Sequence, residues 1–136
     1  ELAQKTLTEA SEELQRRFAP MIAQRAQALF SQFTGSRYNR LQLSRDLSVH
    51  AGAEGEDTLH TALWRSDGTA DQLYLALRLA VAEELIPNAT LVLDDAFVRF
   101  DDDRLAKALA VLKEYASSRQ VILFTCQERE QALLSQ

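Results

Sequence analysis

Two stretches of this 136-residue chain carry residues that could bind a phosphate or a metal ion. The first is Ser66-Asp67-Gly68-Thr69, which stands directly before a long apolar run. If a helix begins near Thr69, free backbone N–H groups and the positive end of the helix dipole point out of this turn. Gly68 would let a ligand approach the backbone, and Ser66 would add a hydroxyl donor, so the turn could hold an anion. Thr69 and Gln72 also match a capping box, and the stretch by itself favours this simpler explanation.

The second stretch is a pair of carboxylates, Asp94 and Asp95, which follow the apolar residues 90–93. A buried parallel strand would deliver them to the carboxyl edge of a sheet, where open α/β sheets bind ligands. Mg²⁺ suits carboxylate and water ligands and usually brings substrate phosphates with it. The alternative is a solvated strand end, followed at residues 101–103 by the cap of the next helix, which we assign to Asp102 or Asp103. The residues alone leave both readings of the Asp94-Asp95 pair open.

The only cysteine, Cys126, stands just before Gln127, after another apolar strand. We interpret it as a small buried filler, because no pattern for cysteine catalysis accompanies it. The two histidines, His50 and His60, are expected on surface strands and cannot form a zinc site without further ligands. A single cysteine excludes a disulfide within the chain and is consistent with a reducing compartment, so we expect a cytoplasmic protein.

The elements that must position these residues follow from periodicity and from breaker residues. Residues 2–33 contain no glycine and read as a helix, which Pro20 should kink or divide. Three strand-like pieces and a hairpin loop at 52–56 come next, and from residue 70 helices alternate with strands. This order predicts an α/β fold with parallel strands covered by helices. The expected strands are 38–43, 47–51, 58–63, 90–93 and 120–125, and the last two helices are 102–115 and 128–134.

Composition narrows the class of protein. Hydrophobic residues make up 46% and charged residues 26%, as in ordinary globular proteins. The net charge of -5 argues against a basic nucleic-acid footprint over the whole chain. No apolar run is long enough for a membrane span, and the N-terminus has neither a signal-peptide pattern nor a starting Met. We therefore expect a fragment or a processed chain.

Taken together, the order and spacing of these stretches resemble the C-terminal lobe of an SMC-type ABC ATPase. "GTADQLYLALRLA", "LVLDDAFVRFDDDRL" and "VILFTC" are most similar to the bacterial DNA-repair ATPases with long coiled coils, relatives of SMC, RecF and RecN. The resemblance covers roughly residues 14–134 and is specific in combination, although each piece is weak alone. It implies part of a P-loop NTPase fold, with residues 1–33 as the end of a coiled coil and 34–136 as the lobe of the ATPase head.

The resemblance also implies roles for individual residues. Ser66-Asp67-Gly68 matches the signature motif, which contacts the γ-phosphate of ATP bound on the opposite subunit. Asp94 would end Walker B and hold Mg²⁺, and Asp95 stands where a glutamate commonly activates the attacking water. Asp101 matches the D-loop aspartate at the dimer interface. Gln127 stands where the switch histidine usually lies.

Four positions differ from the usual family pattern. Arg65 replaces a leucine of the signature motif, and Asp67 places a negative charge beside the predicted phosphate site. Asp95 is a shorter base than glutamate. Gln127 can hydrogen-bond phosphate but cannot supply the charge of an imidazolium, which puts the switch role in question.

The Walker A pattern G-x-x-x-x-G-K-[ST] does not occur in the 136 residues, so the phosphate-binding lysine must come from elsewhere. The resemblance implies an N-terminal ATPase lobe as partner, a second head in a homodimer, DNA, and in some systems a nuclease subunit. We expect ATP as substrate, Mg²⁺ as cofactor, and ATP-dependent head pairing in DNA repair or chromosome maintenance, with this chain inactive alone. Two alternatives stay open: a degenerate interaction module that does not hydrolyse ATP, and a metal-dependent phosphohydrolase.

Overall fold

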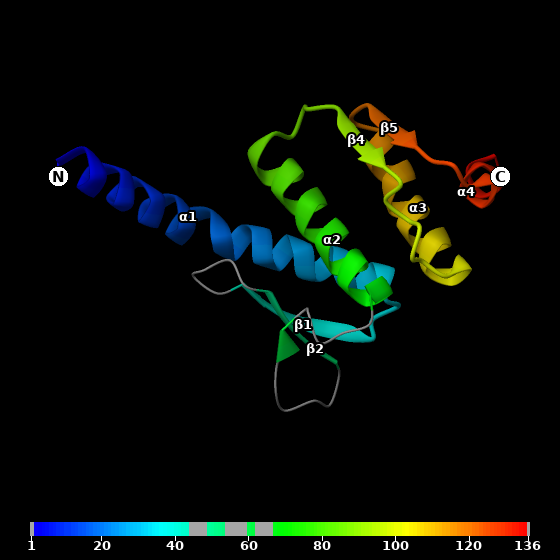
Figure 1. Ribbon diagram of the computed structural model, residues 1–136, viewed down its shortest axis with the longest axis horizontal. Helices are drawn as coiled ribbons and strands as arrows, with labels where there is room; N and C mark the ends of the chain where they lie inside the picture. Colours follow the sequence, from blue (N-terminus) through cyan, green and yellow to red (C-terminus); the bar gives the residue numbers. More distant parts are fainter. Residues whose placement is uncertain (1, 44–48, 54–59, 62–66, 136) are drawn as a thin grey trace.

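The computed structural model describes residues 2–43, 49–53, 60–61 and 67–135 of the chain (Figure 1). An antiparallel sheet and a two-stranded parallel sheet lie on different sides of a group of helices. The helices are α1 (Leu2–Phe33), α2 (Asp67–Leu85), α3 (Asp102–Ala116) and α4 (Glu128–Leu134). The strands are β1 (Tyr38–Leu43), β2 (Val49–Ala53), β3 (His60–Thr61), β4 (Leu91–Asp94) and β5 (Val121–Phe124).

The first helix has a solvated half and a packed half. Its N-terminal part extends away from the other elements, and Leu2 and Leu7 are exposed (Figure 1). Its C-terminal part packs on α2 and β1 and contributes Phe30 and Phe33 to the core. Pro20 does not divide the helix, because α1 is continuous across this residue, and the alternative that it kinks the helix stays a prediction. A proline removes one backbone donor, and the hydrogen bonds on either side can maintain the helix.

The antiparallel sheet has the strand order β1-β2-β3. The predicted strand at 38–43 is confirmed, whereas β2 begins two residues later than predicted. Gly52 lies within β2, opposite Arg40, and not in the hairpin loop to which the sequence assigned it. Ala53 also belongs to β2, and residues 54–56 of that predicted loop lie outside the described residues. The amide of Leu41 donates to Oε1 of Gln27, which ties this sheet to α1.

The second sheet is parallel, as the alternation of helices and strands predicted. β4 pairs with β5 from Leu91↔Val121 to Asp94↔Phe124. Leu93 is buried on the side that packs against the core, whereas Val92 is 56% exposed on the opposite side. The alternation of a strand therefore gives this sheet one covered face and one bare face.

The three longer helices meet in one core, in which Leu79, Leu105 and Ala108 are fully buried. Three polar side chains, one from each of these helices, are hydrogen-bonded to one another beside this core. Nε of Arg25 on α1 and the hydroxyl of Tyr115 on α3 both donate to Oε2 of Glu83 on α2, each at 2.6 Å. Burial alone would raise the pKa of Glu83, but the hydrogen bonds from Tyr115 and Arg25 outweigh burial and lower it. Burial and the bond to Glu83 raise the pKa of Tyr115 to about 12.

Among the described residues, no helix is both long enough and apolar enough to span a membrane.

Candidate phosphate and metal site

The two predicted carboxylates lie where the parallel sheet ends. Asp94 is the last residue of β4 and pairs with Phe124, and Asp95 leaves the strand with a positive φ of 44°. This left-handed conformation is uncommon for a residue with a side chain, although aspartate adopts it more readily than most. The amide of Asp95 still donates to the carbonyl of Phe124 at 3.0 Å. The positive φ therefore turns the chain out of the sheet directly after its last ladder bond.

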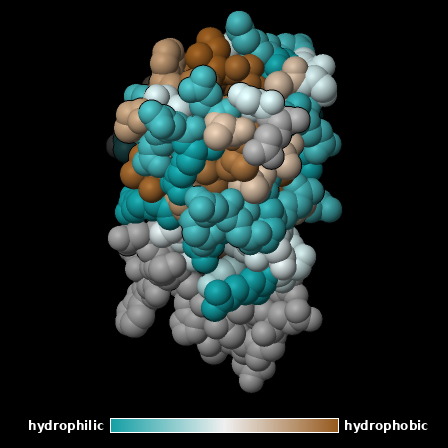
Figure 2. All heavy atoms as spheres, turned by 90° about the vertical axis from the view of Figure 1, so that its right-hand side faces the viewer, coloured by the Kyte–Doolittle hydropathy of each residue, from teal (hydrophilic) through white to brown (hydrophobic). Residues whose placement is uncertain are grey.

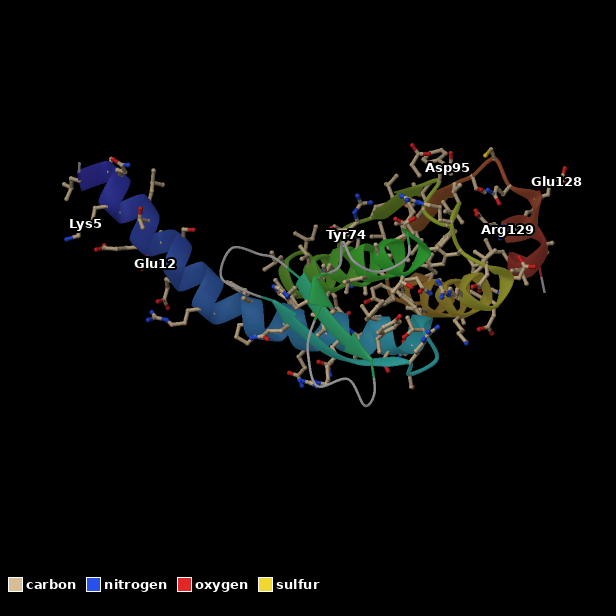
Figure 3. All side chains as sticks on the ribbon, turned by 60° about the horizontal axis from the view of Figure 1, so that its bottom comes forward. Lys5, Glu12, Tyr74, Asp95, Glu128 and Arg129 are labelled. Atoms are coloured by element: carbon tan, nitrogen blue, oxygen red, sulfur yellow. The ribbon has the colours of Figure 1, made fainter. Side chains whose placement is uncertain are left out.

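The side chain of Asp95 connects the ends of the two strands. Its Oδ1 accepts a hydrogen bond from the amide of Cys126 at 3.3 Å. Cys126 is exposed, so the expectation of a buried filler is wrong: β5 ends two residues earlier, and Cys126 lies beyond the sheet. Asp95 and the residues after β5 thus form one edge, with Asp95 at the upper side of Figure 3.

The donor set suits a magnesium ion that is shared with a nucleotide. Asp94 and Asp95 are exposed, and the described residues contain no group of three His, Cys, Asp or Glu side chains that could hold a metal ion. Mg²⁺ is often held by one or two carboxylates together with waters and substrate phosphates. These two carboxylates can supply the protein's share of such a site, but not a closed site.

The predicted signature turn lies at the start of α2, which begins at Asp67 and not near Thr69. Ser66 and Arg65 lie outside the described residues. Gly68 faces the loop at residues 95–101 that follows β4. A Cβ at Gly68 would lie 2.7 Å from the carbonyl oxygen of Arg99 and 3.2 Å from Nη1 of Arg104. The glycine is therefore needed for packing between α2 and this loop, whereas its approach to a ligand stays a prediction.

The capping-box explanation for this turn is wrong. Thr69 is the third residue of α2 and is buried, so it is not the residue before the helix. Nε2 of Gln72 donates to the carbonyl of Phe33 at 3.1 Å, which ties α2 to the end of α1. The pattern of Thr69 and Gln72 thus reflects burial of both side chains, with Gln72 bonded to the end of the first helix.

The loop at 95–101 is held to α2 and ends at a helix cap. Arg99 forms an ion pair with Asp71 on α2, with Nε and Oδ2 2.7 Å apart. Oδ1 of Asp101 accepts from the amide of Arg104 at 2.9 Å, so Asp101 is the N-cap of α3. The sequence had assigned the cap to Asp102 or Asp103, which are instead the first helical residues. The residue predicted as the D-loop aspartate therefore has a structural role as the N-cap, and its place at a dimer interface stays a prediction.

Gln127 is the residue before α4, and its amide donates to Oγ1 of Thr125. Its Oε1 accepts a hydrogen bond from Nε of Arg129 at 2.7 Å. Arg129 also donates to the carbonyls of Phe97 and Phe100, at 3.0 and 2.8 Å. In Figure 3, Arg129 lies between α4 and the loop before α3, whereas Glu128 points away. The sequence did not single out Arg129, because nothing local distinguishes it from a solvated helix arginine.

The two histidines lie in strands of the antiparallel sheet, which confirms the strand assignment but not the predicted surface position. His50 in β2 is half-buried and pairs with Thr61 of β3, and the backbone of His60 pairs with Ala51. Within the described ranges no metal-binding cluster includes them.

Two curated relatives are similar to this chain over 115 residues each. The uncharacterized protein YhaN of Bacillus subtilis (strain 168) is 33% identical, and the DNA double-strand break repair Rad50 ATPase of Methanocaldococcus jannaschii is 30% identical. The matches cover 80% and 82% of this chain but 12% and 11% of the relatives. No protein-family model matches the chain.

Several solved SMC structures have the same fold. One comes from work on ATP-driven dimerization and DNA-stimulated activation of SMC ATPases, with a TM-score of 0.75, 20% identity, and coverage of 90% of this chain and 77% of the other. A second is the Smc head domain with an extended coiled coil bound to the C-terminal domain of ScpA, from Pyrococcus furiosus. Its TM-score is 0.71 at 19% identity, over 95% of this chain and 34% of that one. The SMC head domain from Thermotoga maritima matches with a TM-score of 0.66 at 18% identity, over 96% and 44%.

The structural likeness at these identities establishes the fold, and the sequence relatives point to the same group. This chain therefore has the fold of the solved SMC head domains, and its sequence is similar to part of YhaN and part of the Rad50 ATPase.

Proposed function

We propose that this chain supplies the signature turn, the Walker B carboxylates and the D-loop of an ATP-hydrolysing head, and that a separate lobe supplies Walker A. The head would pair with a second head around ATP, in DNA repair or chromosome maintenance. The Rad50 relative is named as a DNA double-strand break repair ATPase, which supports this assignment.

One observation carries the proposal: the parallel sheet has a bare apolar face directly beside Asp94. Val92 and Phe124 are 56% and 57% exposed, and the strand register places them on the same face as Asp94. Apolar atoms gather near the top of Figure 2, at the height of β4 and β5 in Figure 1. Parallel sheets are usually covered on both faces. A partner lobe that extends this sheet would cover the face and bring its nucleotide to the carboxylates.

The proposed reaction transfers the γ-phosphoryl group of ATP to water. The bond from the γ-phosphorus to the bridging oxygen of ADP breaks, and a bond to the water oxygen forms. The carboxylate of Asp95 orients this water and accepts its proton. The hydrogen bond from Cys126 leaves Asp95 fixed at the edge of the sheet.

Asp94 would hold the magnesium ion, in agreement with the donor set described above. The ion supplies neutralisation of charge on the phosphate oxygens. Ser66 and Gly68 would contact the γ-phosphate bound on the opposite head. The backbone N–H groups at the start of α2 are the donors that such a contact requires.

Reassembly of the two lobes tests whether Walker A lies on a separate lobe from the motifs of this chain. We expect the isolated chain not to bind Mg-ATP tightly, because it contains no Walker A, and calorimetry will measure this directly. We also expect the chain to self-associate or to co-purify with the lobe that bears Walker A. Micromolar affinity of the isolated chain for Mg-ATP, or a monomer with no affinity for that lobe, would contradict the division.

Variants of the reassembled ATPase test the site itself. Asp95→Asn keeps the side-chain volume but removes the base, so nucleotide should still bind while turnover falls by about two to four orders of magnitude. Ser66→Arg should leave ATP binding to a single head intact and block ATP-dependent pairing of heads.

Mixed heads provide the sharper control. Ser66→Arg heads mixed with heads that carry an inactive Walker A retain one composite site in which both motifs are intact. Some ATPase activity should return if Ser66 acts across the interface. No recovery in this mixture, while wild-type heads mixed with either variant hydrolyse ATP, would refute the assignment.

A further inference from the structure

The guanidinium of Arg129 bonds to two parts of the candidate site at once. Nε donates to Oε1 of Gln127, and Nη1 and Nη2 donate to the carbonyls of Phe100 and Phe97. Nη1 also lies 3.3 Å from Oδ1 of Asp102 at the start of α3. The loop at 95–101 separates the proposed base from the proposed D-loop aspartate, so Arg129 joins this loop to the segment after β5.

The contact with Gln127 decides which end of its carboxamide is available. Arginine has donors but no acceptor, so Gln127 must turn its oxygen toward Arg129. Its Nε2, with two N–H donors, then points away from the guanidinium, and no hydrogen bond engages it among the described residues. Without Arg129 the carboxamide could present either its oxygen or its nitrogen to a ligand. An anion accepts only from the nitrogen.

Gln127 directly follows a residue that contacts the proposed base. Cys126, the residue before it, donates to Oδ1 of Asp95 at 3.3 Å. A donor held here would be near the phosphate on which Asp95 acts. Gln127 stands where a switch histidine is expected and carries no charge. Because Arg129 orients its carboxamide, Gln127 can still act as a fixed hydrogen-bond donor.

We propose that Arg129 is a positioning residue that fixes the amide of Gln127 as a hydrogen-bond donor to the γ-phosphate and holds the loop at 95–101 in register with it. This inference rests on the proposed function. It concerns the same ATP site, and it assigns the orientation of the Gln127 amide to Arg129, a residue outside the recognised motifs.

The test compares turnover in the complete ATPase across variants. Arg129→Lys cannot make the same set of bonds, and kcat should fall about 10- to 100-fold, in line with the effect of a small misplacement, with little change in KM for ATP. Gln127→Met removes the amide without adding charge and should lower kcat by about tenfold or more. The double variant should be no slower than the slower single variant, because Arg129 acts through Gln127.

A matched control is available at the other end of α4. Nζ of Lys113 contacts the carbonyl of Leu133 at 3.5 Å, in the last turn of α4, whereas Gln127 stands before its first residue. Lys113→Ala removes one contact to α4 without touching Gln127, so kcat should be unchanged. Gln127→Glu provides the opposite control: it keeps an acceptor for Arg129 but removes the donor, so kcat should fall while the loop stays held.

Amide hydrogen exchange gives a readout that does not require turnover. The amide of Phe100 donates to the carbonyl of Phe97, which Arg129 also binds. Loss of a charge-assisted bond should speed exchange at Phe100 by about tenfold in Arg129→Lys. Exchange should be unchanged in Gln127→Met and Lys113→Ala.

The outcomes separate the two proposals. Three results would overturn the positioning role. The effects of Arg129→Lys and Gln127→Met on kcat could multiply in the double variant, or Gln127→Glu could retain full kcat. The third is a fall in kcat that matches the fall in thermal stability. Absence of ATP turnover in the reassembled wild-type ATPase, with both lobes present, would overturn the proposed function. In that case unchanged exchange at Phe100 in Arg129→Lys would also reject the hold on the loop, and faster exchange would retain it.

Discussion

Gly68→Ala tests whether the glycine of the signature turn serves packing or ligand approach. The structure predicts that this variant is less stable than wild type even in the absence of nucleotide. The added Cβ would meet the carbonyl oxygen of Arg99 at 2.7 Å, and this oxygen belongs to the backbone and cannot rotate away. Either the first turn of α2 or the loop at 95–101 must move.

The cost follows from that contact. To reach an ordinary separation of 3.4 Å, the helix and the loop must move apart by several tenths of an ångström. Overpacking of this kind destabilises by about 1 to 3 kcal/mol. Alanine gains about 0.5 to 1 kcal/mol over glycine inside a helix, and less in its first turn. The net expectation is a loss of about 1 kcal/mol in the free energy of unfolding.

The assay is chemical denaturation of the nucleotide-free protein, together with amide exchange at residues 96–101. Ala70→Gly in the same turn calibrates the contribution of helix propensity. If glycine serves only the approach of a ligand, Gly68→Ala should be as stable as wild type, or slightly more stable, without nucleotide. Unchanged stability and unchanged exchange in the loop would refute the packing argument.

Three further changes probe the core, a buried hydroxyl and the bare sheet face. Leu79→Ala should cost about 2 to 5 kcal/mol in denaturation experiments, because Leu79 is fully buried, whereas Leu85→Ala at an exposed position should cost far less. Tyr115→Phe removes a hydrogen bond to Glu83 and should cost about 1 to 2 kcal/mol. Since the pKa of Tyr115 is raised from 10.0 to about 12, this contribution should be complete below pH 10 and be lost as pH rises toward 12, and equal stability of both proteins at pH 9 would contradict it. Val92→Lys should weaken co-purification with the partner lobe but leave stability nearly unchanged, because Val92 is largely exposed; undiminished co-purification would locate the lobe elsewhere.

The sequence predicted the elements well where the signal was local. The helix at 128–134, the strand at 38–43 and the parallel pairing of β4 with β5 agree with the structure. The helix and the strand depend on hydrophobic periodicity, which a short window of sequence contains, whereas the parallel pairing follows from the order of helices and strands. The bounds of β2 were less accurate, because pairing with a neighbouring strand decides where a ladder ends.

For the candidate site, the sequence determined which residue types follow which strand, and so located the carboxylates at one sheet edge. Only the tertiary structure decided what each polar group contacts. Gln72 bonds to Phe33, 39 residues away, and Arg129 to Phe100, 29 residues away. Gly68 and Arg99 meet in the same manner, through packing of a helix start on a loop. Such partners are favoured because a buried polar group or backbone carbonyl without a hydrogen bond is costly, and no local pattern records which group of the folded chain supplies the bond.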